Sequence, residues 1–143
     1  MKSRIMTTIT NNKEETLIVK EQDVVPLRNR VKEYGVKIGM SILNQTKLIT
    51  ATSELVRNLL KYGGGGKVII ESVSNGRDNG VRVTFIDNGP GIADVDLAMK
   101  DGYSTGKSLG LGLPGTKRLV NEFDIKTELG KGTTVTITKW KNG

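Results

Sequence analysis

The alternation of apolar and polar positions along the chain predicts five strands and three helices. Apolar, β-branched runs with a period of two predict strands at residues 15–20, 67–73, 81–86, 125–129 and 133–140. Helical spacing beside capping residues predicts helices from Asp23 to about residue 35, over about residues 42–62 and from Pro114 through Phe123. The order βααββαββ is typical of an α/β two-layer sandwich, a mixed, mostly antiparallel sheet with helices on one face.

The ends and the longest gap in this pattern set the expected domain organisation. The 143 residues are enough for a single domain with its own core. Residues 1–13 show no periodicity and are expected to form a flexible N-terminal tail before a domain at residues 14–143. Strand 15–20 is expected at a sheet edge. Residues 93–109 are polar, glycine-bearing and only weakly periodic, and a loop of that length predicts a mobile lid.

Composition narrows the class of protein. A hydrophobic content of 36% and a charged content of 26% are ordinary for a globular chain. The lack of cysteine suits a cytoplasmic protein, and no apolar segment approaches the length of a membrane span. The net charge of +7 is scattered and aromatics are 4%, which favours an anionic nucleotide or an acidic protein partner over nucleic acid. The absence of histidine excludes a self-phosphorylating histidine kinase and any histidine base or metal ligand.

Candidate chemistry begins where the strand 81–86 ends, at Asp87-Asn88-Gly89-Pro90-Gly91. A carboxylate only accepts hydrogen bonds, so Asp87 would favour an exocyclic amine such as that of adenine and repel a carbonyl. Gly89 and Gly91 would let the backbone pass close to a flat heterocycle. Taken alone, an ordinary turn after a strand is the better interpretation of the same residues.

Two polar residues in the long helix supply a second set of groups. Glu54 and Asn58 are four residues apart and therefore project from one face, one turn apart. Mg²⁺ prefers oxygen ligands and keeps several waters, so the Asn58 amide together with phosphate oxygens is a reasonable metal site. Glu54 could then accept the proton of an attacking hydroxyl. Without other motifs, both residues would simply be surface residues, as Arg57 and Lys61 are expected to be.

A second glycine-rich stretch leads into the helix that begins near Pro114. Gly110 and Gly112 would leave backbone N–H groups unpaired at the positive end of a helix dipole, which makes a phosphate cradle. A tight loop that needs glycine only for packing is the alternative. Lys107 could reach the phosphates, although a solvated lysine is the simpler expectation.

Two familiar phosphate-binding patterns overlap this stretch and fail. Residues 102–108 nearly spell a P-loop but have three residues between the glycines where a P-loop has four. Residues 110–115 match the spacing of the dinucleotide-binding motif. No strand leads into either segment, so both interpretations are rejected.

Together with residues 130–134, these motifs resemble, in order, the N, G1, G2 and final Gly-Thr boxes of the GHKL ATPase/kinase superfamily, which has the Bergerat fold. The resemblance covers nearly everything from Thr16 to Trp140. The chain is most similar to the switch kinases of bacterial sigma-factor control, the RsbT, RsbW and SpoIIAB group, and its motifs most resemble those of the RsbT-like members. One departure is that residues 107–109 lack the arginine that SpoIIAB-like members carry before the G2 glycines.

The resemblance implies a role for each candidate residue. Adenine would lie at Asp87, with Gly89 and Gly91 close to the ring, and Thr133 would help to hold it through water. The triphosphate would lie at Gly110 and Gly112. Glu54 would be the general base and Asn58 the Mg²⁺ ligand, so the implied cofactors are ATP and Mg²⁺.

Two functions from different classes remain open. The first is an ATP-Mg²⁺-dependent serine/threonine-protein kinase whose substrate is, by the resemblance, a STAS-domain protein in sigma-factor or stressosome partner switching. The second is a regulatory module that binds nucleotide and controls a partner, such as a sigma factor or a phosphatase, with little phosphoryl transfer. A homodimer is possible in either case. Because mere binding needs no base, Glu54 favours the kinase.

Two further readings are weaker. An ATPase of the gyrase or MutL type needs a following domain with a phosphate-contacting lysine, and the sequence ends at Gly143. A detached histidine-kinase catalytic domain stays possible and would need its histidine on another protein.

Overall fold

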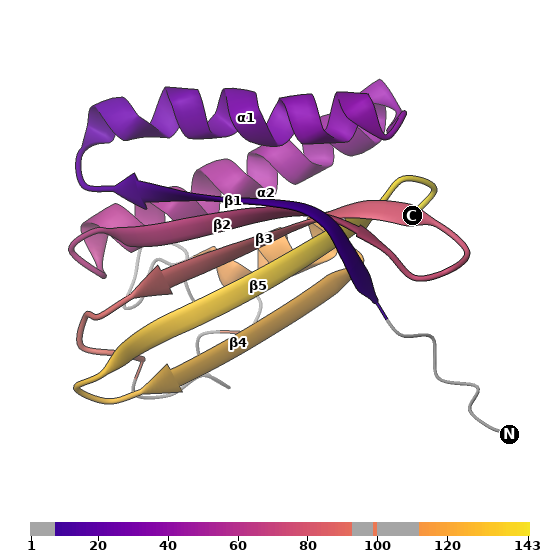
Figure 1. Cartoon of the computed structure of the whole chain (residues 1–143). Coiled ribbons are helices and arrows are strands. Elements are labelled where there is room, and N and C mark those ends of the chain that lie inside the picture. The colour runs from indigo at the N-terminus through magenta and orange to yellow at the C-terminus, as the bar shows by residue number, and fades with distance from the viewer. Residues whose placement is uncertain (1–7, 93–98, 100–111) are drawn as a thin grey trace, which may run out of the picture.

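A computed structural model describes residues 8–92, 99 and 112–143 of the chain. Five strands form one sheet in the order β1-β2-β3-β5-β4 (Figure 1). They are β1 (Ile9–Ile18), β2 (Gly66–Ser74), β3 (Asn79–Asp87), β4 (Glu122–Glu128) and β5 (Gly132–Trp140). All four pairings among these strands are antiparallel, so the parallel component that a mixed sheet would contain is absent from the described part of the chain.

The edge strand β1 is longer than the sequence pattern predicts. It begins at Ile9, which is opposite Ser74, and Lys13 is opposite Glu71 of β2. The expectation of a flexible tail is therefore wrong for residues 9–13. Pairing with β2 satisfies backbone N–H and C=O groups of this polar segment. Because the outer side of an edge strand stays in water, the segment needs no alternation of apolar side chains.

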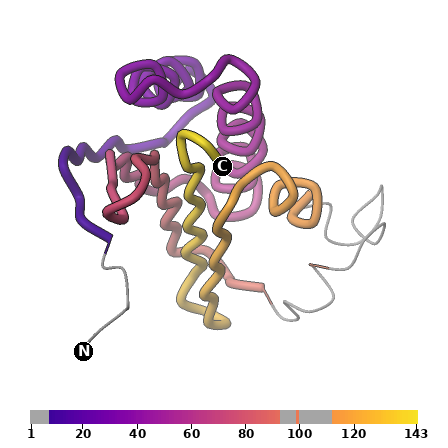
Figure 2. The backbone as a smooth tube through the Cα atoms, turned by 90° about the vertical axis from the view of Figure 1, so that its right-hand side faces the viewer, coloured from indigo at the N-terminus to yellow at the C-terminus, as the bar shows by residue number. Residues whose placement is uncertain are grey.

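Two long helices follow β1 and cover the sheet. A short 3₁₀ turn, η1 (Glu21–Asp23), leads into α1 (Val24–Lys37), and α2 (Ile42–Lys61) comes next. Ser41 caps α2, because its hydroxyl accepts the Asn44 N–H at 3.1 Å. Seen along the sheet, α2 and α4 lie on the same side of the strands (Figure 2).

The third helix, α4 (Leu113–Leu119), is shorter than predicted. The expected continuation through Phe123 is wrong, because the chain joins the sheet first. The N–H of Asn121 donates to the Thr138 carbonyl, and the Asn121 side chain accepts the N–H of Trp140. Phe123 then belongs to β4, where burial alternates from residue to residue, so a period of two replaces the helical period.

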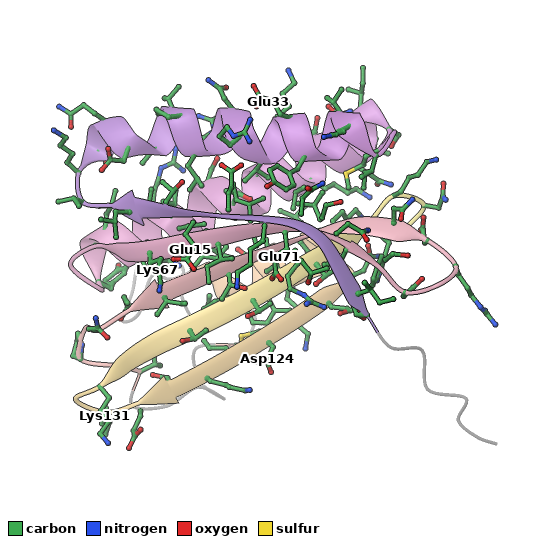
Figure 3. The ribbon with its side chains drawn as sticks, in the orientation of Figure 1. Glu15, Glu33, Lys67, Glu71, Asp124 and Lys131 are labelled. Carbon is green, nitrogen blue, oxygen red and sulfur yellow. The ribbon has the colours of Figure 1, made fainter. Side chains whose placement is uncertain are left out.

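The core lies between the helices and the inner face of the sheet. Its buried apolar side chains come from β1, β2, β3, β5, α1, α2 and α4, and include Ile18, Leu27, Val31, Leu48, Leu55, Val56, Val68, Ile70, Val83, Leu113 and Ile137. The opposite face carries charged side chains, among them Glu15, Lys67, Glu71 and Asp124, which project from the strands away from the helices (Figure 3). Helices therefore cover one face of the sheet, as the sequence predicts.

Candidate functional site

Asp87 is the last residue of β3 and is held in place by backbone N–H groups. Its Oδ1 accepts the N–H of Gly89 at 2.8 Å and that of Thr133 at 3.2 Å. No other hydrogen bond to this carboxylate is found among the described residues. One oxygen is thus occupied by the protein and Oδ2 remains available as an acceptor.

Gly63 explains how this carboxylate fits beneath the end of α2. A Cβ added to Gly63 would lie 2.6 Å from both Cβ and Cγ of Asp87 and 2.7 Å from its Oδ2. A Cβ on Gly89 would in turn lie 2.9 Å from the Cα of Gly63. Side chains at either position would displace the acid, so these glycines serve close backbone approach.

A cavity of about 350 Å³ opens in front of Asp87. Its walls come from the last turns of α2, the end of β3 with the turn that follows, the start of α4, and the β4–β5 hairpin. The lining is largely apolar, with Asp87, Asn58, Tyr62 and Thr133 as polar groups. The other lining residues are Leu55, Leu59, Phe85, Pro90, Gly91, Ile92, Leu113, Ile125 and Val135. A mainly apolar cleft with a few convergent polar groups is typical of a small-molecule site.

The β4–β5 hairpin supports the wall formed by Pro90, Gly91 and Ile92. The Ile92 N–H donates to Thr127 Oγ1 at 2.8 Å, and the Gly130 N–H donates to the Pro90 carbonyl at 2.9 Å. Gly91 has φ 81°, a conformation that favours glycine. These bonds tie the turn after Asp87 to β4 and β5.

Glu54 lies beside the start of α4. Gly112 precedes that helix with φ 65°, and a Cβ there would lie 2.9 Å from Glu54 Oε2. Glu54 is half-buried on α2, one turn before Asn58, which lines the cavity. The predicted base and the predicted phosphate-side glycine are therefore neighbours, although they are far apart in the sequence.

The remaining predicted residues divide into two groups. Gly110, Lys107 and nearly all of the predicted lid at residues 93–109 lie outside the described residues. Arg57 and Lys61 are exposed, as expected, and the Lys61 ammonium lies 5.2 Å from the centre of the Tyr62 ring.

Sequence analysis missed three residues that shape the site. Tyr62 lines the cavity, Gly63 packs against Asp87, and Thr127 bonds to Ile92 and Thr133. A signal for Thr127 exists in the sequence, because it continues the inward positions of Phe123 and Ile125 with a hydroxyl.

The donor set fits a nucleotide with its magnesium ion. Mg²⁺ bound to a nucleotide takes most of its oxygens from phosphate and water, and one amide such as that of Asn58 completes such a set. No cluster of three or more acidic, histidine or cysteine residues that could hold a metal ion exists in the described ranges.

The fold and the site together define a class. The sheet is covered by helices on one face, and an acid at a strand end lies at a largely apolar cavity, with a helical Glu–Asn pair beside a glycine. This combination is typical of a nucleotide-binding ATPase or kinase domain. Residues 43–142 match the family model of the histidine kinase-, DNA gyrase B- and HSP90-like ATPases. The chain belongs to this family, the one that the sequence motifs resemble.

Individual relatives are similar over most of their length. The serine/threonine-protein kinase RsbT of Bacillus subtilis (strain 168) is 39% identical over 123 residues, which are 86% of this chain and 92% of the relative. The anti-sigma F factor of Thermoanaerobacter sp. (strain X514) is 28% identical over 135 residues, or 92% and 94% of the two chains. That of Geobacillus sp. (strain WCH70) is 31% identical over 120 residues, or 79% and 81%.

A solved structure supports the fold. The RsbU and RsbW domains of Rv1364c from Mycobacterium tuberculosis superpose with a TM-score of 0.61 at 24% identity. The match covers 90% of this chain and 32% of that one. Among the described residues, no helix is both long and apolar enough to cross a membrane.

Proposed function

We propose that the chain is an ATP- and Mg²⁺-dependent serine/threonine-protein kinase. The observation that carries the proposal is one cavity that both Asp87 and Asn58 line, with Glu54 one helical turn from Asn58 and against Gly112. The similarity to the RsbT kinase at 39% identity supports the same activity.

The base of the nucleotide is assigned to the Asp87 end of the cavity. Asp87 Oδ2 accepts a hydrogen bond from the exocyclic amine, and the apolar walls exclude water from the ring faces. Gly89 and Gly91 keep the turn close to the ring, and Thr133 supplies a hydroxyl beside the acid. Guanine would bring a carbonyl to the acid and lose affinity.

The reacting end is assigned to Glu54 and Asn58. Asn58 would hold a magnesium ion, which would supply positive charge to neutralise the phosphates. Glu54 accepts the proton of a partner's serine or threonine hydroxyl. The oxygen of that hydroxyl bonds to the γ-phosphorus as the bond from the γ-phosphorus to the β-phosphate oxygen breaks, which releases ADP. Gly110 and Gly112 are assigned to the phosphate tail.

The acceptor is proposed to be a STAS-domain protein in sigma-factor or stressosome partner switching, with a sigma factor or a phosphatase as a further partner. The motif resemblance and the similarity to RsbT and the anti-sigma F factors support this assignment. The site of action is proposed to be the cytoplasm.

The test is phosphate transfer from labelled ATP-Mg²⁺ to candidate STAS proteins by the wild type and by Glu54→Gln. We expect Glu54→Gln to bind ATP normally but to transfer phosphate about 10²–10⁴-fold more slowly, the usual contribution of a general base. Glu33→Gln, on the exposed surface of α1 (Figure 3), is the matched control and should transfer normally. Unchanged transfer by Glu54→Gln would remove Glu54 as the base.

The similarity to the anti-sigma F factors motivates the second candidate, a nucleotide-dependent binding module. The same assay separates the two functions. A wild type that binds ATP and a partner but leaves every candidate acceptor unphosphorylated would favour the binding module.

A further inference from the structure

A second cavity, of about 530 Å³, lies between α1 and α2. It is lined by side chains from residues 25–32 of α1 and 42–50 of α2, two helices that lie on the same face of the sheet (Figure 1). It shares no lining residue with the cavity at Asp87. Its volume is in the range of small-molecule sites, and the proposed kinase function gives it no role.

The charged side chains that line this cavity are cations. They are Arg28 and Lys32, which are four residues apart on α1 and so project from one face of the helix. No acid lines the cavity, and neither cation forms an ion pair with any residue that the structure describes. The cavity therefore carries positive charge that its own lining does not neutralise.

The Nε atom of Arg28 is buried and has no hydrogen-bond partner in the described part of the chain. A buried donor without an acceptor is unfavourable, since it has lost water and gained nothing in exchange. The Nε–H and a neighbouring terminal N–H of a guanidinium form a fork that matches the two oxygens of a carboxylate or phosphate. Because Arg28 lines the cavity, an oxyanion bound there would supply the missing acceptor.

The polar side chains of α2 beside the cavity already use hydrogen-bond donors on the backbone. Thr46 Oγ1 donates to the Ile42 carbonyl at 2.9 Å, and Gln45 Nε2 donates to the Met40 carbonyl at 2.8 Å. The two cations of α1 are therefore the main donors left for a ligand.

Apolar side chains complete the lining. Val25, Ile42 and Ile49 belong to it, and Val25 and Ile42 are 57% and 79% exposed. Covering these side chains with an apolar group would remove their surface from water, which is favourable. A ligand that complements the cavity thus combines a negatively charged head with an apolar body.

We propose that this cavity is a second ligand site, which binds a small organic anion. Its carboxylate or phosphate head pairs with Arg28 and Lys32, and its apolar body packs on the side chains of Val25 and Ile42. The inference does not depend on the proposed kinase function, because the two cavities share no residue. Thr50, which also lines the second cavity, precedes Glu54 by one turn, so the ligand contacts the helix that carries the candidate base.

The experiment uses octanoate as the probe, because it joins a carboxylate to an apolar chain, and octanol as its uncharged counterpart. Amide chemical shifts of the whole ¹⁵N-labelled chain are followed during each titration, with and without ATP-Mg²⁺. Arg28→Met keeps the apolar stem without the guanidinium, and Arg28→Lys keeps the charge without Nε. Arg77→Met, at an exposed arginine between β2 and β3, is the matched control. Urea denaturation checks that each variant is folded.

We expect octanoate to shift the amides of residues 25–32 and 42–50, whether or not ATP is present. Arg28→Met should raise the Kd for octanoate at least about tenfold, the scale of one hydrogen bond to a charged group, and leave the binding of octanol unchanged. Arg28→Lys should recover only part of the affinity, because an ammonium lacks the planar fork. Arg77→Met should bind octanoate as the wild type does.

Four results would overturn the inference. Octanoate could shift only amides outside the two segments, or Arg28→Met could leave its Kd unchanged. Octanol could bind as tightly as octanoate, which would make the cavity merely apolar. An acidic peptide of alternating leucine and glutamate could bind the same segments much more tightly than octanoate, which would replace the small molecule by the acid side chain of a partner protein.

Discussion

One oxygen of Asp87 is engaged by the protein, and the other has no hydrogen-bond partner among the described residues. Oδ1 receives the N–H groups of Gly89 and Thr133, which come from two different segments, and this arrangement fixes the direction of Oδ2. A carboxylate oriented by backbone donors keeps its geometry without depending on a flexible partner. At the scale of one residue, the specificity of the site therefore depends on which atom faces the ligand.

Asp87→Asn is predicted to reverse the preference of this position for a ligand amine over a ligand carbonyl. The two backbone donors will hold the amide oxygen of asparagine, so its NH₂ will face the cavity and meet the exocyclic amine donor to donor. We expect the Kd for ATP to rise about 100-fold, as expected for a lost charged hydrogen bond together with an unpaired donor. Calorimetric titration with ATP and GTP measures the effect.

The matched control is Asp124→Asn, an exposed aspartate on the open face of the sheet (Figure 3). It should bind ATP as the wild type does. Normal ATP binding by Asp87→Asn would mean that the base is recognised elsewhere.

At the scale of an element, α4 is a short helix with a glycine inside it. It has seven residues, and a Cβ at Gly115 would meet no atom of the described residues within 4 Å. Glycine inside a helix costs stability because its unfolded backbone has more freedom to lose.

Gly115→Ala is therefore predicted to raise the free energy of unfolding by about 0.5–1 kcal/mol, measured by urea denaturation. Gly112→Ala is the contrasting variant, because its φ of 65° and its contact with Glu54 oppose a side chain. Gly112→Ala should lose both stability and ATP affinity. A destabilised Gly115→Ala would show that α4 needs glycine there for a reason other than backbone freedom.

The junction of β1 and α1 depends on a carboxylate that sequence analysis assigned differently. Asp23 precedes α1, but its side chain makes no capping bond within that helix. Its Oδ2 accepts the N–H of Val19 at 2.8 Å and that of Lys20 at 3.0 Å. These bonds, the one from Val19 first, lower the pKa of Asp23 below its ordinary value.

The linkage to pH follows from this direction. Because the pKa of Asp23 is lower in the folded state, the unfolded chain binds the proton more tightly. The contribution of Asp23 to the free energy of unfolding is therefore complete above its ordinary pKa of 3.8. It is lost as the pH falls through the folded value. Asp23→Ala should therefore lower the urea midpoint at pH 7, and its difference from the wild type should shrink below about pH 4.

Glu21→Ala, an exposed acid in the same turn, serves as the control and should change the midpoint little. Comparing variants at each pH also cancels the titration of Glu14, whose pKa is lowered by its bond to Arg30. A difference between Asp23→Ala and the wild type that stays constant down to pH 2 would contradict the assignment.

At the scale of the whole molecule, the site ties together elements that are distant in sequence. α2, β3, α4 and the β4–β5 hairpin each contribute lining residues to one cavity. A ligand that contacts all of them binds only the folded chain, and so it stabilises the molecule as a unit.

ATP with Mg²⁺ is predicted to raise the free energy of unfolding by about 2.7 kcal/mol at a concentration 100 times its Kd. Differential scanning fluorimetry should show a rise of several degrees in Tm for the wild type and a much smaller rise for Asp87→Asn, which a Kd about 100-fold higher leaves only half saturated at the same concentration. An equal rise in both proteins would place the nucleotide outside this cavity.

The sequence alone determined the order of the strands and the long helices and named several of the residues that meet at the candidate site. Periodicity placed α2, the strands that become β2 and β3, and the helical Glu54–Asn58 pair, because these depend on contacts between near neighbours. The motif resemblance supplied the family, which the family model and the relatives confirm. The assignments of Glu54, Asn58 and Asp87 to particular roles stay predictions.

Only the tertiary structure decided how distant groups meet. β1 extends to Ile9 because β2 offers it a partner, and α4 stops at Leu119 because Asn121 bonds to β5. Gly63 packs against Asp87, and Thr127 bonds to Ile92; both pairs are more than 20 positions apart in the sequence. Thr127 also contacts Thr133, six positions away on the neighbouring strand. Such contacts have no local pattern, since they depend on the path of the whole backbone.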